Sequence, residues 1–139
     1  MRAVLILEDK PDRRAEFERL APALGGGEEF EVLIWDDANR MRSECERFLS
    51  RAALISLEHD LDGKPGMNPH PGTGLELAEF LAEKKPVCPV IVHTSNTDRS
   101  FSILNELRFA DWRVDRVGPV GEKWIEKYWT AKARELLVS

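Results

Sequence analysis

Side chains capable of chemistry gather directly after three short apolar segments of this sequence. The clusters are Glu8–Asp9, Glu58–Asp60 and His93–Asn96. Short continuous apolar runs are typical of buried parallel strands, and ligands of open α/β sheets bind beyond the carboxyl ends of such strands. We therefore expect the three clusters to line one pocket.

Two histidines, His59 and His93, belong to these clusters. Imidazole titrates near neutral pH, so one ring can accept a proton from water while another donates a proton to a leaving oxygen. The pair predicts the acid and base of a phosphodiester hydrolysis. A third histidine, His70, is either a lid contact or a solvated loop residue. The competing interpretation is that a histidine at a strand end is a hydrogen-bonded packing residue.

The carboxylates of the clusters suggest a divalent metal site. The candidate ligands are Glu8, Asp9 and one of Glu58 or Asp60. Carboxylate oxygens are the ligands that magnesium prefers, whereas two imidazoles and a carboxylate would suit zinc, manganese or iron. Glu8 and Asp9 have an alternative structural role as helix-capping residues whose repulsion Lys10 or Arg13 relieves.

Strand geometry limits which of these side chains can share a ligand. Side chains alternate along a strand, so Glu58 and Asp60 point to one face and His59 to the other. All three can reach one ligand only if the strand has already ended before His59.

Three polar residues, Thr94, Ser95 and Asn96, precede an amphipathic segment. Hydroxyl and amide donors at a helix N-terminus favour phosphate, because the free N–H groups and the helix dipole attract anions. An ordinary N-cap uses the same residue types, which leaves a purely structural role open.

The composition is that of an ordinary soluble domain. The chain has 139 residues, 42% hydrophobic and 32% charged, which predicts one domain over residues 1–139 without disulfide or metal staples. A net charge of -5 argues against a general nucleic-acid surface. No apolar segment is long enough for a membrane span, and we expect a cytoplasmic protein whose partner is a small phosphorylated ligand.

Strand and helix patterns alternate along the chain. Strands are predicted at 3–7, 31–35, 52–57, 89–92 and 112–117. A helical apolar stripe follows each strand, with the first helix ending at the glycines of 25–27 and the last running over 122–138. Thr97 or Asp98 is the predicted cap of the fourth helix. The connection 61–74, with four glycines and three prolines, is unusually long and hence a candidate functional loop. This alternation predicts an α/β fold with a five-stranded parallel sheet between two layers of helices.

Three segments of the chain resemble the response-regulator receiver (CheY-like) superfamily. They are Leu5–Asp9, Gly72–Leu77 and Pro89–Thr94. The resemblance implies a doubly wound sheet of order 2-1-3-4-5 with its pocket over the first, third and fourth strands. It further implies that the acids after the first strand hold a divalent cation and that Thr94 contacts a phosphoryl group.

The chain departs from receivers at two positions. The phosphoacceptor aspartate of receivers matches Glu58, or Asp60 after a two-residue shift, which counts against phosphotransfer signalling. The lysine-proline pair of receivers is replaced by 116–119, which reads Arg-Val-Gly-Pro, so Arg113 or Arg116 would have to substitute for the lysine.

Both histidine clusters, 57–61 and 93–96, resemble the cyclic-phosphate-processing receiver domains. That resemblance implies a site that binds and hydrolyses a small cyclic phosphate, such as a cyclic nucleotide derivative or a 2',3'-cyclic phosphate, with magnesium, manganese or zinc. The alternative function is a catalytically silent pseudo-receiver that acts through protein contacts. The sequence leaves the metal, the natural ligand and the oligomeric state open.

Overall fold

The computed structural model describes residues 1–63 and 66–138 and contains one five-stranded parallel sheet. The strands are β1 (Ala3–Leu7), β2 (Glu31–Trp35), β3 (Ala52–Leu57), β4 (Val90–Val92) and β5 (Val114–Arg116). Their order is β2-β1-β3-β4-β5, which confirms the predicted order 2-1-3-4-5. β5 is shorter than predicted, because Trp112 and Val117 lie outside the sheet pairing.

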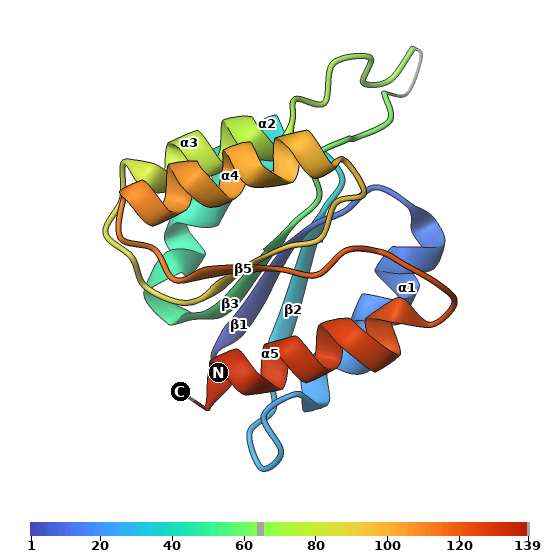
Figure 1. Cartoon of the computed structure of the whole chain (residues 1–139), viewed down its shortest axis with the longest axis vertical. Helices are drawn as coiled ribbons and strands as arrows, with labels where there is room; N and C mark the ends of the chain where they lie inside the picture. The colour runs from blue at the N-terminus through green and yellow to red at the C-terminus, as the bar shows by residue number, and fades with distance from the viewer. Residues whose placement is uncertain (64–65, 139) are drawn as a thin grey trace.

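Helices cover both faces of the sheet (Figure 1). One layer holds α2 (Ala38–Glu44), α3 (Gly74–Ala82) and α4 (Thr97–Phe109), drawn above the sheet. The other layer holds α1 (Pro11–Leu20) and α5 (Thr130–Leu137), drawn below it. The architecture is therefore the predicted three-layer, doubly wound α/β fold. Among the described residues, every helix is too short or too polar to cross a lipid bilayer.

Three predicted helices change their winding along their length. α1 gives way to a short 3-10 turn, η1 (Ala21–Ala23), where Pro22 has no N–H for a helical hydrogen bond. α2 continues as a 3-10 segment, η2 (Cys45–Arg51). The closing helix begins as a π-helical segment, η3 (Ile125–Trp129), directly before α5.

Side-chain caps fix the starts of three helices. Asp37 accepts a hydrogen bond from the Arg40 amide at α2. Thr73 accepts from the Glu76 amide at α3. The cap of α4 is Asn96, so the prediction of Thr97 or Asp98 was wrong by one or two residues.

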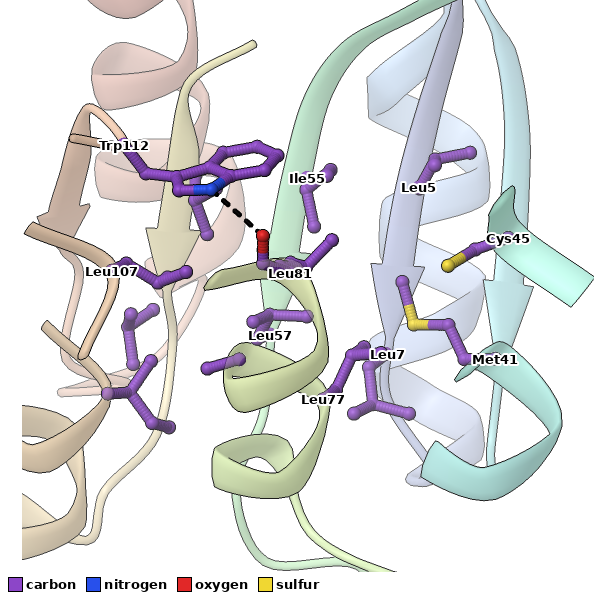
Figure 2. Close-up of a cluster of buried hydrophobic side chains, with 14 of the residues drawn as sticks. Leu5, Leu7, Met41, Cys45, Ile55, Leu57, Leu77, Leu81, Leu107 and Trp112 are labelled. Carbon is purple, nitrogen blue, oxygen red and sulfur yellow. Dashed lines mark hydrogen bonds between the residues drawn. The ribbon is translucent and has the colours of Figure 1, made fainter. Parts of the chain in front are cut away.

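Alternate residues of the central strands supply two hydrophobic cores. One core joins β1 and β3 to α2, α3 and α4 through buried residues that include Leu5, Leu7, Met41, Ile55, Leu57, Leu77, Leu107 and Trp112 (Figure 2). Trp112 closes this core at its far end, where its Nε1 donates a hydrogen bond to the Leu81 carbonyl. The other core joins the opposite faces of the same strands to α1 and α5 through Val4, Ile6, Leu54, Phe17 and Trp129. Burial on both faces explains why these strands read as unbroken apolar runs.

The connection from β3 to α3 extends away from the body of the domain (Figure 1). Two residues of the predicted functional loop 61–74, at positions 64 and 65, lie outside the described residues. The loop ends where the Gly74 amide donates to the His59 carbonyl over 3.1 Å. A Cβ on Gly74 would lie 2.3 Å from the backbone oxygen of Glu58, so only glycine allows α3 to start against the end of β3.

Gly74→Ala is therefore expected to destabilise the domain. The added methyl group must push α3 away from the end of β3, and overpacking of this kind costs roughly 1–3 kcal/mol. Gly27→Ala is the matched control, because a Cβ there meets nothing within 4 Å, and it should stay within about 0.5 kcal/mol of the parent. Urea unfolding measures both, and equal midpoints would contradict the close approach.

Candidate functional site

The residues that directly follow β1, β3 and β4 form the centre of the site, because the last residues of these strands are in register. Leu7 pairs with Leu57, and Leu57 pairs with Val92. The residues that follow are Glu8, Glu58 and His93, whose exposed fractions are 0%, 3% and 0%. Contacts with residues of α1 place all three on the α1 and α5 side of the sheet. The structure thus brings one residue from each predicted cluster into one buried group.

His93 is held by a partner on each ring nitrogen. Its Nδ1 lies 2.6 Å from Ser56 Oγ, and its Nε2 lies 3.2 Å from Glu8 Oε1. We assign the proton to Nε2 because a carboxylate can only accept, so the Ser56 hydroxyl donates to Nδ1. Ser56 Oγ in turn accepts from Trp129 Nε1 over 2.9 Å. A continuous hydrogen-bond chain therefore runs from Trp129 through Ser56 and His93 to Glu8.

Aromatic rings enclose this chain. The Phe17 ring lies 5.1 Å from the His93 ring and 4.7 Å from that of Trp129, and Trp124 lies 6.0 Å from His93. The order Ser56, His93 and Glu8 matches that of a serine nucleophile, its base and an acid. Ser56 is fully buried, however, and the Trp129 indole already occupies its oxygen. Ser56 therefore has a structural role, as a link in this hydrogen-bond chain.

Arg13 of α1 lies between the two buried carboxylates. Its Nη1 is 3.1 Å from Glu58 Oε2 and 3.6 Å from Glu8 Oε1. The guanidinium carbon also lies 5.3 Å from the centre of the Trp124 ring, within range of a cation–π interaction. Sequence reasoning gave Arg13 only a general charge-balancing role. Its position in the first turn of the helix that follows β1 is the signal that it could reach the site.

Backbone amides donate hydrogen bonds to both glutamates. Glu8 Oε2 accepts from the amides of Asp9 and Lys10, and Glu58 Oε1 accepts from those of His59 and Asp60. Burial by itself raises the pKa of Glu8. The hydrogen bond from His93, with the Lys10 amide and the Arg13 charge, outweighs burial and holds that pKa below its ordinary value. Glu8 is therefore an ionised, buried carboxylate.

Asp9 follows Glu8 in the chain but lies outside the group of Glu8, Glu58 and His93. Its Oδ2 accepts from the Asp62 amide over 2.5 Å. Its Oδ1 is buried and has no hydrogen-bond partner among the described residues. Burial, with the neighbouring charge of Glu8, raises the pKa of Asp9 above its ordinary value. An unpartnered buried carboxylate oxygen is a position that a cation would stabilise.

His59 faces the other layer of helices. Its Nδ1 accepts a hydrogen bond from the Leu75 amide in the first turn of α3, and its Nε2 lies 3.9 Å from Asp60 Oδ1. Burial lowers the pKa of His59, and the charge of Asp60 opposes this only in part. The two predicted catalytic imidazoles therefore bond to separate sets of partners, although β3 ends at Leu57 and His59 lies beyond the strand.

The predicted phosphate residues lie at the start of α4. Asn96 Oδ1 accepts from the Arg99 amide, and its Nδ2 donates to the exposed Asp60 over 3.3 Å. Thr94 is buried and its Oγ1 accepts from the Asn96 amide, whereas Ser95 is exposed. The capping role that the sequence left open is present at Asn96, and Ser95 is the member whose side chain faces solvent.

His70 is an exposed residue of the long loop. Its backbone carbonyl accepts from Asn39 Nδ2 over 3.2 Å, which ties this part of the loop to α2.

Arg116 lines a cavity with Tyr128 and Lys132 of the closing helix. Among the ion pairs of the described residues, Arg13 of α1 is the arginine that contacts the buried carboxylates Glu8 and Glu58.

The donor set fits a divalent cation. Glu8, Glu58 and His93 each offer one ligand atom, and these atoms lie within 4.8 Å of one another. Two carboxylate oxygens suit magnesium, and the added imidazole nitrogen favours manganese or zinc. Of the predicted metal ligands, Glu8 and Glu58 belong to this group, while Asp9 borders it and Asp60 is exposed.

The fold resembles response-regulator receiver domains of known structure. A LuxR-family DNA-binding response regulator from Staphylococcus aureus has 20% sequence identity and a TM-score of 0.65, over 96% of this chain and 99% of that chain. The BeF3-activated DrrB receiver domain has 15% identity and a TM-score of 0.66, over 100% and 99%. The Mn2+-bound form of the response regulator Rcp1 has 19% identity and a TM-score of 0.59, over 94% and 95%.

No family model and no curated protein matches the chain. Identities at this level establish a shared receiver fold, and the function of a fold member is decided by its site. The resemblance to receivers is confirmed for the architecture. Membership of the cyclic-phosphate-processing group stays a prediction.

Ser56→Ala tests the buried hydrogen-bond chain. The substitution leaves His93 Nδ1 and Trp129 Nε1 without their shared partner, and an unpaired buried polar group costs about 1–3 kcal/mol. The free energy of unfolding in urea should fall by that amount. Ser43→Ala, at an exposed serine of α2, should change it by less than about 0.5 kcal/mol. An unchanged free energy of unfolding for Ser56→Ala would show that the hydrogen-bond chain contributes nothing to stability.

Asp9→Asn is expected to stabilise the folded chain at neutral pH. The amide keeps an oxygen for the Asp62 N–H but removes a buried charge next to Glu8. We expect a gain of about 1 kcal/mol, or a rise in Tm on the order of 4 °C. The advantage should shrink as the pH falls through the raised pKa of Asp9, because the parent carboxyl then becomes neutral. A Tm difference that grows in acid would contradict this assignment.

Proposed function

We propose that the site at the carboxyl ends of β1, β3 and β4 binds a small cyclic phosphate together with a divalent cation. The observation that carries the proposal is the buried group of Glu8, Glu58 and His93, three metal-ligating side chains from three strands within 4.8 Å. Ligands of doubly wound sheets bind at this edge. The Mn2+-bound structure of Rcp1, which shares the fold, is compatible with a cation here.

The phosphate would bind at the start of α4, next to these ligands. α4 is a 13-residue helix, and its N-terminal N–H groups and dipole favour an anion. Ser95 adds an exposed hydroxyl at that point, while Asn96 holds the helix start in place through the Arg99 amide. When bound, the cation would neutralise charge on the phosphate.

The finer proposal is that the bound cyclic phosphate is hydrolysed. A water oxygen bonds to phosphorus, one ring P–O bond breaks, and the leaving oxygen takes up a proton. His59 Nε2 accepts the water proton, because its Nδ1 is engaged by the Leu75 amide and its lowered pKa keeps the ring neutral. His93 donates to the leaving oxygen from its doubly protonated form and returns to the neutral ring, which requires its Nε2 contact with Glu8 to open and leaves Glu8 and Glu58 to hold the cation.

The second candidate is a catalytically silent receiver-like module that signals through protein contacts. Its support is the state of His93, which is fully buried and has partners on both ring nitrogens. In that case the histidine stabilises the buried carboxylate of Glu8 and takes no part in proton transfer. Turnover separates the two candidates.

Thermal-shift measurements with 2',3'-cyclic and 3',5'-cyclic nucleotides test the binding proposal. Each nucleotide is added with Mg2+, Mn2+ or Zn2+, and the metal alone is the reference. A ligand at 100 times its Kd should stabilise the native state by about 2.7 kcal/mol. Glu58→Gln should reduce the shift, whereas Glu79→Gln, at an exposed glutamate of α3, should preserve it.

Phosphorus NMR of the same mixtures reports turnover. Conversion of the cyclic phosphate to a monoester that is lost in His59→Ala supports hydrolysis. Binding without any product supports the silent module. The absence of a shift with every cyclic phosphate and metal would overturn the binding proposal itself.

A further inference from the structure

We propose that Arg13 is a built-in competitor of the divalent cation, and that its side chain must leave the two glutamates for the cation to bind. The inference rests on the proposed function, because it assumes that Glu8, Glu58 and His93 are metal ligands. Arg13 Nη1 lies 3.1 Å from Glu58 Oε2 and 3.6 Å from Glu8 Oε1. Those glutamates are also two of the three candidate ligands.

The competition follows from charge at a buried site. Glu8 and Glu58 are almost completely buried, and buried carboxylates that lie close together need a compensating positive group. The guanidinium of Arg13 supplies that charge, and the Arg13 side chain is only 17% exposed. A divalent cation on the same oxygens would supply it instead, and the two positive groups would repel each other across a region of low dielectric.

The structure offers the Arg13 side chain a second position. Arg13 and Trp124 line a cavity of about 330 Å³ between the start of α1 and the segment before α5. Three carboxylates, Asp12, Glu16 and Glu122, line the same cavity beside a single lysine, Lys123. The guanidinium already lies over the Trp124 ring. A rotation about the side-chain bonds of Arg13 would therefore move its charge from one acidic environment to another.

Movement of Arg13 would be visible at Trp124. The cation–π contact changes when the guanidinium moves relative to the ring, so indole fluorescence should respond to cation binding. Trp124 also lies 6.0 Å from the ring of His93, a proposed ligand, so the readout of Arg13 movement is the part of the fluorescence change that Arg13→Gln removes.

Direct metal titration tests the inference. Mn2+ affinity is measured by calorimetry and by electron paramagnetic resonance for the parent, Arg13→Gln and Arg13→Lys. Arg13→Gln removes the charge and should bind Mn2+ at least about tenfold tighter, whereas Arg13→Lys keeps a charge and should stay near the parent. Arg14→Gln is the matched control on the same helix, since Arg14 pairs with Asp36, and its affinity should not change. Arg13→Met serves as the uncharged variant if the glutamine variant does not fold.

Fluorescence with diamagnetic Mg2+ gives the second readout. The parent should change its tryptophan emission on saturation, while Arg13→Gln and Trp124→Phe should lose that change and still bind the ion. Equal or weaker Mn2+ binding by the uncharged variants would overturn the competition and leave the metal site intact. Failure of both the parent and the uncharged variants to bind Mn2+ or Mg2+ would overturn the metal site and the competition together.

Discussion

Compensation of buried negative charge is the constraint on which this end of the domain depends. Glu8 and Glu58 stand at the ends of two adjacent central strands and are almost completely removed from water. Each carboxylate turns back to accept from the two backbone amides that follow it, and Arg13 contacts both. Without these donors, desolvation would drive the carboxyl groups to the neutral form or the strands apart. α1 therefore packs where its arginine can reach both strand ends.

The same polar group extends into the core beneath α5. His93 connects Glu8 to Ser56, and Ser56 accepts from the indole of Trp129 at the last residue of η3. Isolated π-helical turns inside helices occur frequently at functional sites. Here the π segment carries a tryptophan that bonds to the central strand. The carboxyl end of the sheet and the closing helix are thus joined by hydrogen bonds as well as by apolar packing.

Much of the architecture could be predicted from local patterns. Unbroken apolar runs predicted the buried parallel strands, and their alternation with helical stripes predicted the α/β class. The resemblance to receivers implied the sheet order. The composition of the site could also be predicted from the strands, because Glu8, Glu58 and His93 are each the first residue beyond aligned strand positions. Applying that rule to all three strands would have separated His59 from His93. Details of winding, such as η2, η3 and the cap at Asn96, depend on packing and on single hydrogen bonds that no periodicity reports.

By itself, the sequence determined the α/β class and the end of the sheet at which the polar residues gather, because periodicity and apolar run length reflect burial directly. The sheet order followed only from the resemblance to receivers. Only the tertiary structure decided which of those residues touch. Arg13 meets Glu58 across 45 positions of the chain, and Trp129 meets Ser56 across 73. Such contacts arise because α1 and α5 pack side by side on one face of the sheet. That arrangement is set by the two hydrophobic cores and leaves no local mark on the residues that it brings together.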